Sequence, residues 1–248
     1  MPRLPRKKSE SGIYHIILRG INQQVIFEDD EDYIQFIKTL EKYKTVCGYK
    51  IFAYCLMSNH VHILIKVGKE DLELILKRIA GSYVYWYNWK YYRKGHLFQD
   101  RFKSECVEDD AYFLTVLRYI HQNPLKAKIV NKVSDYKYSS YNEYIHPNNT
   151  LIDNDFVLEM MSIGEFVEFN NIINNDECLD MEEQIFRISD SDAISIIKKI
   201  SGCDTPDDFN ALTVSEKNNY ICLLKKEGLS IRQISRLTGI SFAIVRKI

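Results

Sequence analysis

The strongest restriction on the fold is a pair of apolar runs, Lys50–Met57 and His60–Val67, which are separated only by Ser58 and Asn59. Both runs are rich in β-branched and aromatic residues, the composition typical of strands. A two-residue connection joins antiparallel strands as a tight hairpin, whereas parallel strands need a long crossover. The chain is therefore predicted to contain an antiparallel sheet that includes this hairpin.

Other segments supply further strands and helices. Predicted strands cover Gly12–Leu18 and Arg101–Val107. The predicted helices begin in the acidic cluster Glu28–Asp32 and end at Gly48, cover Asp71–Trp89, and cover Asp109–Asn123 with a stop at Pro124. The order strand, helix, strand, strand, helix, strand, helix predicts an α+β fold, namely a ferredoxin-like antiparallel sheet backed by helices on one face.

Charge divides the chain into three blocks, although the net charge is only −1. Residues 1–146 carry 23 basic and 17 acidic side chains, residues 147–216 carry 3 and 16, and residues 217–248 carry 7 and 1. Two basic ends suit a polyanionic partner, and chance clustering on solvated faces is an equal alternative. Together with the structure-breaking run His146–Thr150, the charges predict a sheet domain (1–146), an acidic, partly helical connecting segment (147–214) and a C-terminal module (215–248).

The C-terminal module has a helix-turn-helix pattern. Helices are predicted over Ser215–Lys226, Ile231–Thr238 and Phe242–Ile248, with Gly239-Ile240-Ser241 as the turn. An ordinary helical hairpin is the alternative explanation. Four basic side chains of this module favour contact with DNA: Arg232, Arg236, Arg246 and Lys247.

Composition also restricts the environment of the chain. No run of about 18 apolar residues is present, so no transmembrane helix is expected. The basic N-terminus, MPRLPRKKSE, lacks the apolar stretch of a signal peptide. The six cysteines form no CxxC pair. We therefore expect a cytoplasmic protein with reduced thiols and no membrane contact.

His60 and His62 are candidate metal ligands. Alternate residues of a strand share a face, so both imidazoles are expected to project the same way. Such a pair can chelate one ion, because imidazole is a good ligand for Mn, Zn and similar metals. Two partly exposed polar side chains are the more frequent explanation of a His-x-His strand, and the pair alone leaves the choice open.

Tyr119 and Asn123 lie one turn apart on a predicted helix and therefore share a face. An amide oxygen can complete a metal site begun by two histidines. A phenol beside a metal-bound phosphate is a credible nucleophile. Because the chain has 17 tyrosines, packing is the ordinary role of any one of them.

The stretch from Arg78 to Arg93 interleaves aromatic and basic residues. Unpaired bases stack on aromatic faces while cations hold the phosphates, so the stretch suits single-stranded nucleic acid. About half of these rings are expected to pack the helix on the sheet instead.

Four motifs resemble, in order and spacing, the IS200-like (Y1) transposases of the HUH superfamily, and most of all the branch associated with repeated extragenic palindromes. The motifs are Tyr14-His15 with Arg19-Gly20, Met57–Leu64, Gly95–Gln99 with Arg101-Phe102, and Arg118–Pro124 with Ala127. The resemblance covers roughly residues 10–145. Lys128 and Tyr138 stand where relatives often carry glycine and tryptophan, but neither touches the expected chemistry.

The resemblance implies a transposase that nicks and joins single-stranded DNA through a 5′-phosphotyrosine. It implies Tyr119 as the nucleophile and a divalent ion, Mg²⁺ or Mn²⁺, held by His60, His62 and Asn123. The implied partner is single-stranded or hairpin DNA, bound by a monomer or homodimer without a small-molecule cofactor. Within the shared motifs, Arg19 and Arg101 are candidate DNA contacts.

Two questions stay open at the level of sequence. A free phenol has a pKa of about 10, so Tyr119 needs a proton acceptor, and the candidates are His15, His121, Lys126 and a metal-bound water. The alternative function is a domesticated DNA-binding regulator that does not transpose, although the intact set of site residues argues against lost chemistry. A metal-independent phosphoesterase would need two His-x-Ser/Thr motifs, and the chain has a single His-x-His.

Overall fold

The structure is a computed structural model, and it describes residues 6–99, 102–146, 151–172, 174, 176, 178, 179, 188 and 190–248. The chain divides into two compact units, Met1–Glu182 and Glu183–Ile248. Each unit has its own buried apolar core.

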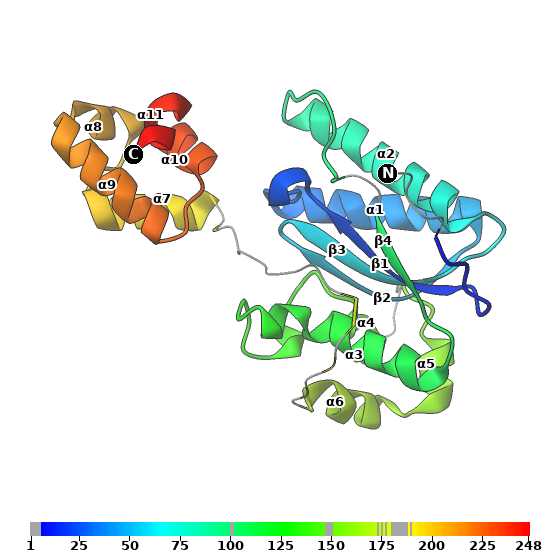
Figure 1. The fold of residues 1–248 in the computed structure, drawn as a ribbon. Helices are drawn as coiled ribbons and strands as arrows, with labels where there is room; N and C mark the ends of the chain where they lie inside the picture. Colours follow the sequence, from blue (N-terminus) through cyan, green and yellow to red (C-terminus); the bar gives the residue numbers. More distant parts are fainter. Residues whose placement is uncertain are drawn as a thin grey trace. The chain divides into compact units, whose positions relative to one another are not determined.

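The first unit is built around a four-stranded antiparallel sheet (Figure 1). Its strands are β1 (Ile13–Arg19), β2 (Lys50–Met57), β3 (His60–Lys66) and β4 (Lys103–Cys106), in the order β2-β3-β1-β4. The β2–β3 hairpin turns at Ser58 and Asn59, as predicted. This strand order is the ferredoxin-like one, so the predicted α+β class is confirmed.

Two helices cover one face of the sheet, α1 (Asp30–Cys47) and α2 (Leu72–Lys90). The α1 helix begins where the Asp29 carboxylate accepts a hydrogen bond from the Asp32 amide, and it ends at Gly48, whose φ of 69° is left-handed. The two helices pack through Phe36 and Tyr83, whose ring centroids are 5.0 Å apart. Together they form one helical layer packed against the sheet.

The third helix, α3 (Asp110–Lys126), covers the opposite face (Figure 1). The prediction that helices back one face only is therefore wrong. All but the last residue of β3 are buried, because helices cover the sheet on both sides. Side chains of β1 and β3 that point toward α3 are consequently enclosed between sheet and helix.

The α3 helix also runs through Pro124, where it was expected to stop. Proline removes one backbone donor, and in the last turn of a helix this costs a single hydrogen bond. The turn is closed beyond it by the Ala127 amide, which donates to the Asn123 carbonyl at 2.9 Å. Lys126 is thereby kept on the helix, two turns after Tyr119.

Short elements complete the first unit. They are the 3-10 turns η1 (Ile21–Gln23) and η2 (Val133–Asp135), α4 (Tyr141–Ile145), α5 (Asp155–Met160) and α6 (Ile163–Asn171). Val157 of α5 and Phe166 of α6 are fully buried in the core of this unit. The first part of the acidic segment therefore belongs to the first unit.

The second unit is entirely helical within its described residues. Its helices are α7 (Asp190–Ser201), α8 (Pro206–Ala211), α9 (Val214–Lys226), α10 (Ile231–Thr238) and α11 (Phe242–Lys247). Ala193 of α7 and Phe209 of α8 share a buried core with Ile234 of α10. The division at 182/183 thus differs from the boundaries expected at 146 and 214, because packing rather than charge sets it.

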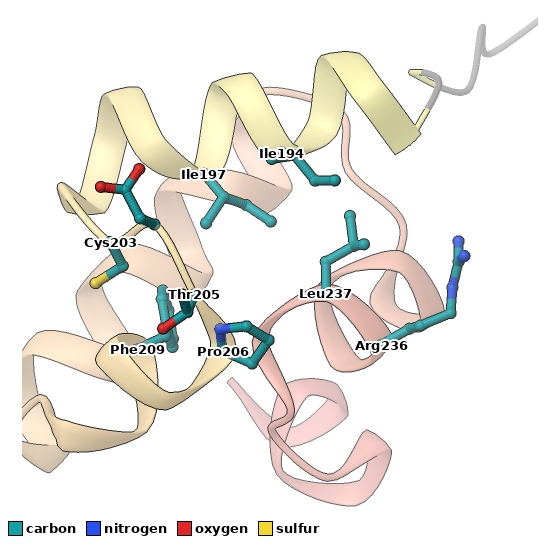
Figure 2. Close-up of a pocket in the computed structure, with 9 residues that line it drawn as sticks. Ile194, Ile197, Cys203, Thr205, Pro206, Phe209, Arg236 and Leu237 are labelled. Carbon is teal, nitrogen blue, oxygen red and sulfur yellow. The ribbon is translucent and has the colours of Figure 1, made fainter.

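The α10–α11 pair has the predicted helix-turn-helix arrangement. Gly239 starts the turn with a φ of 72°, a left-handed backbone conformation that favours glycine. Val245 of α11 is fully buried. A pocket between α7, α8 and α10 is lined mainly by apolar side chains, and Figure 2 shows Leu237 of α10 pointing toward Ile194 and Ile197 of α7.

No helix among the described residues is both long and apolar enough to cross a membrane.

Candidate active site between the sheet and helix α3

Strand register gathers three histidines and one arginine on the face that α3 covers. In the β1–β3 pairing, His62 lies opposite Ile17 and His60 lies opposite Arg19. Directly paired residues project from the same face of a sheet, and so do residues two positions apart on one strand. His15 is two positions from Ile17 and therefore joins this face. The predicted common orientation of His60 and His62 is present, with ring centroids 5.0 Å apart.

Tyr119 reaches this face from α3. Its ring stands edge-on to two histidines, with centroids 5.8 Å from His62 and 6.0 Å from His15. The side chain is 4% exposed, so it is held between helix and sheet. Asn123, one turn later, is also buried, and its amide nitrogen donates to the Tyr119 carbonyl at 3.1 Å.

The histidines form an incomplete hydrogen-bond network. His62 Nδ1 lies 3.0 Å from His15 Nε2, and His60 Nδ1 lies 2.7 Å from the Asn59 side-chain oxygen. That oxygen only accepts, so His60 donates from Nδ1 and carries its lone pair on Nε2. Two buried ring nitrogens, His62 Nε2 and His15 Nδ1, have no hydrogen-bond partner among the described residues. No local sequence pattern predicts these partners of the histidines, because strand pairing brings His15 and His62 together.

Burial keeps the three imidazoles neutral. It lowers the pKa of His15 to about 3 and that of His60 to about 3, where the positive charge of Arg19 adds to the effect. Burial and the neighbouring His60 and His15 hold the pKa of His62 well below its usual value. Neutral imidazole is the form that binds a metal ion, so no proton has to leave these rings at neutral pH.

The donor set suits a divalent ion. His62 offers a buried Nε2 without a partner in the described residues, and His60 adds a neutral imidazole whose Nδ1 lies against the Asn59 side-chain oxygen. The Asn123 side-chain nitrogen is hydrogen-bonded to the Tyr119 carbonyl. The side-chain oxygen of Asn123 is therefore the atom that can serve as a metal ligand. The described part of the chain contains no group of three or more His, Cys, Asp or Glu side chains placed to hold a metal. An ion here would therefore depend on an amide or on groups from solvent and substrate in addition to the histidines.

Two cations border the site. Arg19 is half-buried, and its Nη2 is enclosed without a hydrogen-bond partner in the described residues. Lys126 Nζ lies 4.6 Å from the centroid of the Tyr119 ring. A guanidinium nitrogen without a protein acceptor suits a phosphate oxygen. Arg101, the other arginine expected to contact DNA, lies outside the described residues.

His121 is separate from this site. Its two ring nitrogens lie 3.0 Å from Asn170 Oδ1 and 3.0 Å from Ser140 Oγ. Its ring packs edge-on against Phe166 at 5.7 Å. Of the side chains considered as proton acceptors, His15 and Lys126 contact the Tyr119 ring, whereas His121 is a packed core histidine.

The aromatic stretch of α2 divides between core and surface, as expected. Tyr83 and Tyr87 are buried, whereas Tyr85, Trp89 and Tyr92 are 79%, 72% and 97% exposed. The α2 helix covers the face of the sheet opposite to α3, so these exposed rings do not line the site around Tyr119. Stacking of bases on them stays a prediction.

The basic residues of the second unit have different surroundings. Arg232, Arg246 and Lys247 are exposed. Arg236 instead donates to Asp190 at 2.8 Å and ties α10 to α7. Its guanidinium therefore already has an anionic partner within its own unit.

Comparison with known proteins shows what the part of the chain that contains the site resembles. A family model described as "Transposase IS200 like" matches residues 8–123, a range that contains Tyr119, His60, His62 and Asn123. A Haemophilus influenzae protein named as a REP-associated tyrosine transposase is 29% identical over 125 residues, which are 44% of this chain and 69% of that protein.

A solved structure shares the fold. It is that of a REP-associated tyrosine transposase bound to a REP hairpin, with a TM-score of 0.55 at 16% identity over 75% of this chain and 99% of the other. The family model, the relative and the common fold agree with the motifs found in the sequence. Residues 8–123 of this chain are therefore similar to the IS200-like transposases.

Proposed function

We propose that this protein cleaves and rejoins single-stranded DNA in a transposase-type reaction, with Tyr119 as the nucleophile. The observation that carries the proposal is the position of Tyr119, which is held edge-on to His62 and His15 between α3 and the sheet. The match of residues 8–123 to the IS200-like family model supports the same chemistry. Tyr119 is a tyrosine whose ring meets a candidate ligand, His62, and its neighbour His15.

We further propose that His60, His62 and Asn123 hold Mg²⁺ or Mn²⁺. The support is the donor set itself: two neutral imidazoles, the unpartnered His62 Nε2 and an amide oxygen one turn from Tyr119. A bound divalent ion would polarise the scissile phosphate and stabilise the charge that develops on it.

The chain's own residues account for the covalent steps. The Tyr119 oxygen attacks the phosphorus, the bond from phosphorus to the 3′-oxygen breaks, and a 5′-phosphotyrosine and a free 3′-hydroxyl result. The phenol proton leaves, and the departing 3′-oxygen gains one. Attack by a 3′-hydroxyl on the phosphotyrosine reverses the step and joins two strands without an external energy source.

Cations beside Tyr119 are suited to hold the DNA backbone. Arg19 lies opposite His60 in the sheet, and its Nη2 has no partner in the described chain. We infer that this nitrogen binds an oxygen of the scissile phosphate. Lys126, over the Tyr119 ring, adds positive charge where the phenolate develops.

The proposed partner is hairpin DNA with single-stranded flanks. The solved neighbour of similar fold was determined with a REP hairpin, which supports this choice of substrate. In the second unit, the exposed Arg232, Arg246 and Lys247 on the helix-turn-helix suit phosphate contacts. These contacts would add affinity, whereas the chemistry stays in the first unit.

The test is a nicking assay on a hairpin-containing single strand with Mn²⁺, followed by mass spectrometry of the covalent adduct. Tyr119→Phe removes only the hydroxyl, so cleavage should fall at least about 1000-fold while DNA affinity stays within about threefold. Tyr85→Phe, on the exposed face of α2, is the matched control and should cleave normally.

An adduct on another tyrosine, or cleavage by Tyr119→Phe within tenfold of the parent protein, would refute the assignment. Tight binding of hairpin DNA without any cleavage by the parent protein would favour a DNA-binding regulator instead.

A further inference from the structure

We propose that His15 is the positioning residue that fixes the tautomer of His62 and thereby the nitrogen that His62 presents to a metal ion. The inference rests on the metal site proposed above. His15 is fully buried on β1, and its Nε2 lies 3.0 Å from His62 Nδ1. The two rings stack with centroids 5.3 Å apart and an angle of 26° between their planes.

The hydrogen bond between His62 Nδ1 and His15 Nε2 contains a single proton, which one of the two nitrogens donates. In one arrangement His62 donates from Nδ1 and His15 accepts at Nε2, which leaves the His62 lone pair on Nε2. In the other arrangement His15 donates from Nε2, and His62 then carries its remaining proton on Nε2. Only the first arrangement allows His62 Nε2 to bind a metal, because a protonated ring nitrogen has no lone pair to share.

Hydrogen bonding within the protein does not choose between the two arrangements. The first leaves an N–H on His15 Nδ1 and the second leaves one on His62 Nε2, and both atoms are buried without a partner in the described residues. Glu105, which pairs with His15 across β1 and β4, already accepts hydrogen bonds from the Tyr112 hydroxyl and the Leu179 amide. A metal ion at His62 Nε2 therefore selects the first arrangement, and His15 must act as the acceptor.

His15 is thus assigned a role that differs from proton transfer with Tyr119. Its Nε2 is occupied by His62, and its ring meets the Tyr119 ring edge-on at a centroid distance of 6.0 Å. An outer partner that orients a metal-binding imidazole commonly contributes 10- to 100-fold to metal affinity. His15 acts on the reaction through His62.

The first test compares two amides at position 15 by calorimetric titration of the full chain with Mn²⁺. A glutamine side chain places its oxygen about where imidazole Nε2 lies, whereas asparagine is too short. His15→Asn should weaken Mn²⁺ binding about 10- to 100-fold, and His15→Gln should stay within about threefold of the parent protein. His121→Asn is the matched control, because His121 is equally buried but separate from the site, and it should leave Mn²⁺ affinity unchanged.

Equal Mn²⁺ affinity of folded His15→Asn and the parent protein would overturn the role of His15 while leaving the metal site intact. Absence of Mn²⁺ binding in the parent protein would instead refute the metal site itself, and with it the basis of this inference. Circular dichroism reports whether each variant is folded.

A second measurement needs no variant. The chain has six histidines, so ¹⁵N labelling of histidine alone gives a resolvable set of ring nitrogens. With saturating Mg²⁺, two-bond ¹H–¹⁵N spectra should show His62 protonated at Nδ1 and His15 protonated at Nδ1. Protonation of His62 at Nε2 under these conditions would overturn the proposal even where His15→Asn does not fold.

Discussion

Two buried clusters contain histidine, namely His121 with its partners Asn170 and Ser140, and the His15–His62 pair, and they differ in how completely their hydrogen bonds are satisfied. His121 has Asn170 and Ser140 on its two ring nitrogens and is surrounded by aromatic rings. His62 and His15 satisfy each other through one nitrogen each, and each keeps one buried nitrogen without a partner in the described chain.

The difference is the one expected between a histidine that stabilises the fold and histidines of the proposed metal site. Burial of a polar group without a partner costs about 1–3 kcal/mol, so a purely structural site would be expected to satisfy it. His121 meets that expectation, whereas the His15–His62 pair does not. The unsatisfied buried nitrogens of His62 and His15 on one enclosed face therefore support the proposed site.

Replacing one histidine of each cluster with alanine should have the largest and most different effects on cleavage and on stability. His62→Ala should lower cleavage about 1000-fold, because a metal ligand is lost. His121→Ala should leave cleavage within about threefold at low temperature but reduce the free energy of unfolding by about 2–4 kcal/mol, since Asn170 and Ser140 lose their partner and a cavity opens.

Single-turnover cleavage and urea unfolding of the two variants test this contrast. If His121→Ala lost cleavage as severely as His62→Ala while still folded, the distinction between the two clusters would fail.

Acid should destabilise the first unit well before the second. Burial lowers the pKa of His121 to about 4 from an ordinary value of 6.5, so the folded state binds fewer protons than the unfolded state. Its contribution is present above pH 6.5 and is lost as the pH falls toward 4, about 3 kcal/mol over that range. His15 and His60 act in the same direction. The second unit has no histidine and lacks this dependence.

Tryptophan fluorescence can follow this difference, because Trp86 and Trp89 both belong to the first unit. Between pH 6.5 and 4 the urea midpoint seen by fluorescence should fall, while a separate helical transition seen by circular dichroism should change little. Parallel loss of both transitions would contradict the assignment of the acid effect to buried histidines.

The second unit shows a similar but smaller contrast, between a basic side chain that has an anionic partner and basic side chains that are exposed. Arg236 is paired with Asp190, whereas Arg246 and Lys247 are exposed on α11. Replacing Arg246 and Lys247 with alanine should lower the slope of log affinity for hairpin DNA against log salt by about 2. Arg236→Ala should leave that slope unchanged and reduce stability by at most about 1 kcal/mol, as for an exposed ion pair. Equal slopes for all three proteins would show that α11 does not contact phosphates.

Local periodicity explains which elements were predictable. The two-residue link between β2 and β3 specifies a hairpin wherever the strands pack, and Gly48 and Gly239 mark helix ends through left-handed backbone conformations. The position of α3 was not predictable in this way. The sequence signal for it is the uninterrupted apolar run Ile63-Leu64-Ile65 in β3, which is typical of a strand covered on both faces.

The domain boundaries were predicted from charge, and charge is a poor guide to packing. Acidic side chains lie on the surfaces of α5 to α8, while buried residues such as Phe166 and Phe209 join different cores. A boundary at 214 would separate α9 from α7, with which it shares a core. The division at 182/183 follows the apolar contacts instead.

By itself the sequence determined which side chains share a face: His60 with His62 through the period of two of a strand, and Tyr119 with Asn123 through the turn of a helix. It also determined the motifs that make residues 8–123 similar to the IS200-like transposases. The tertiary structure alone decided that His15 meets His62, because the two are 47 residues apart and only strand pairing brings them together. It also decided which histidines are satisfied and which are not, since burial and hydrogen-bond partners are contributed by segments distant in the chain.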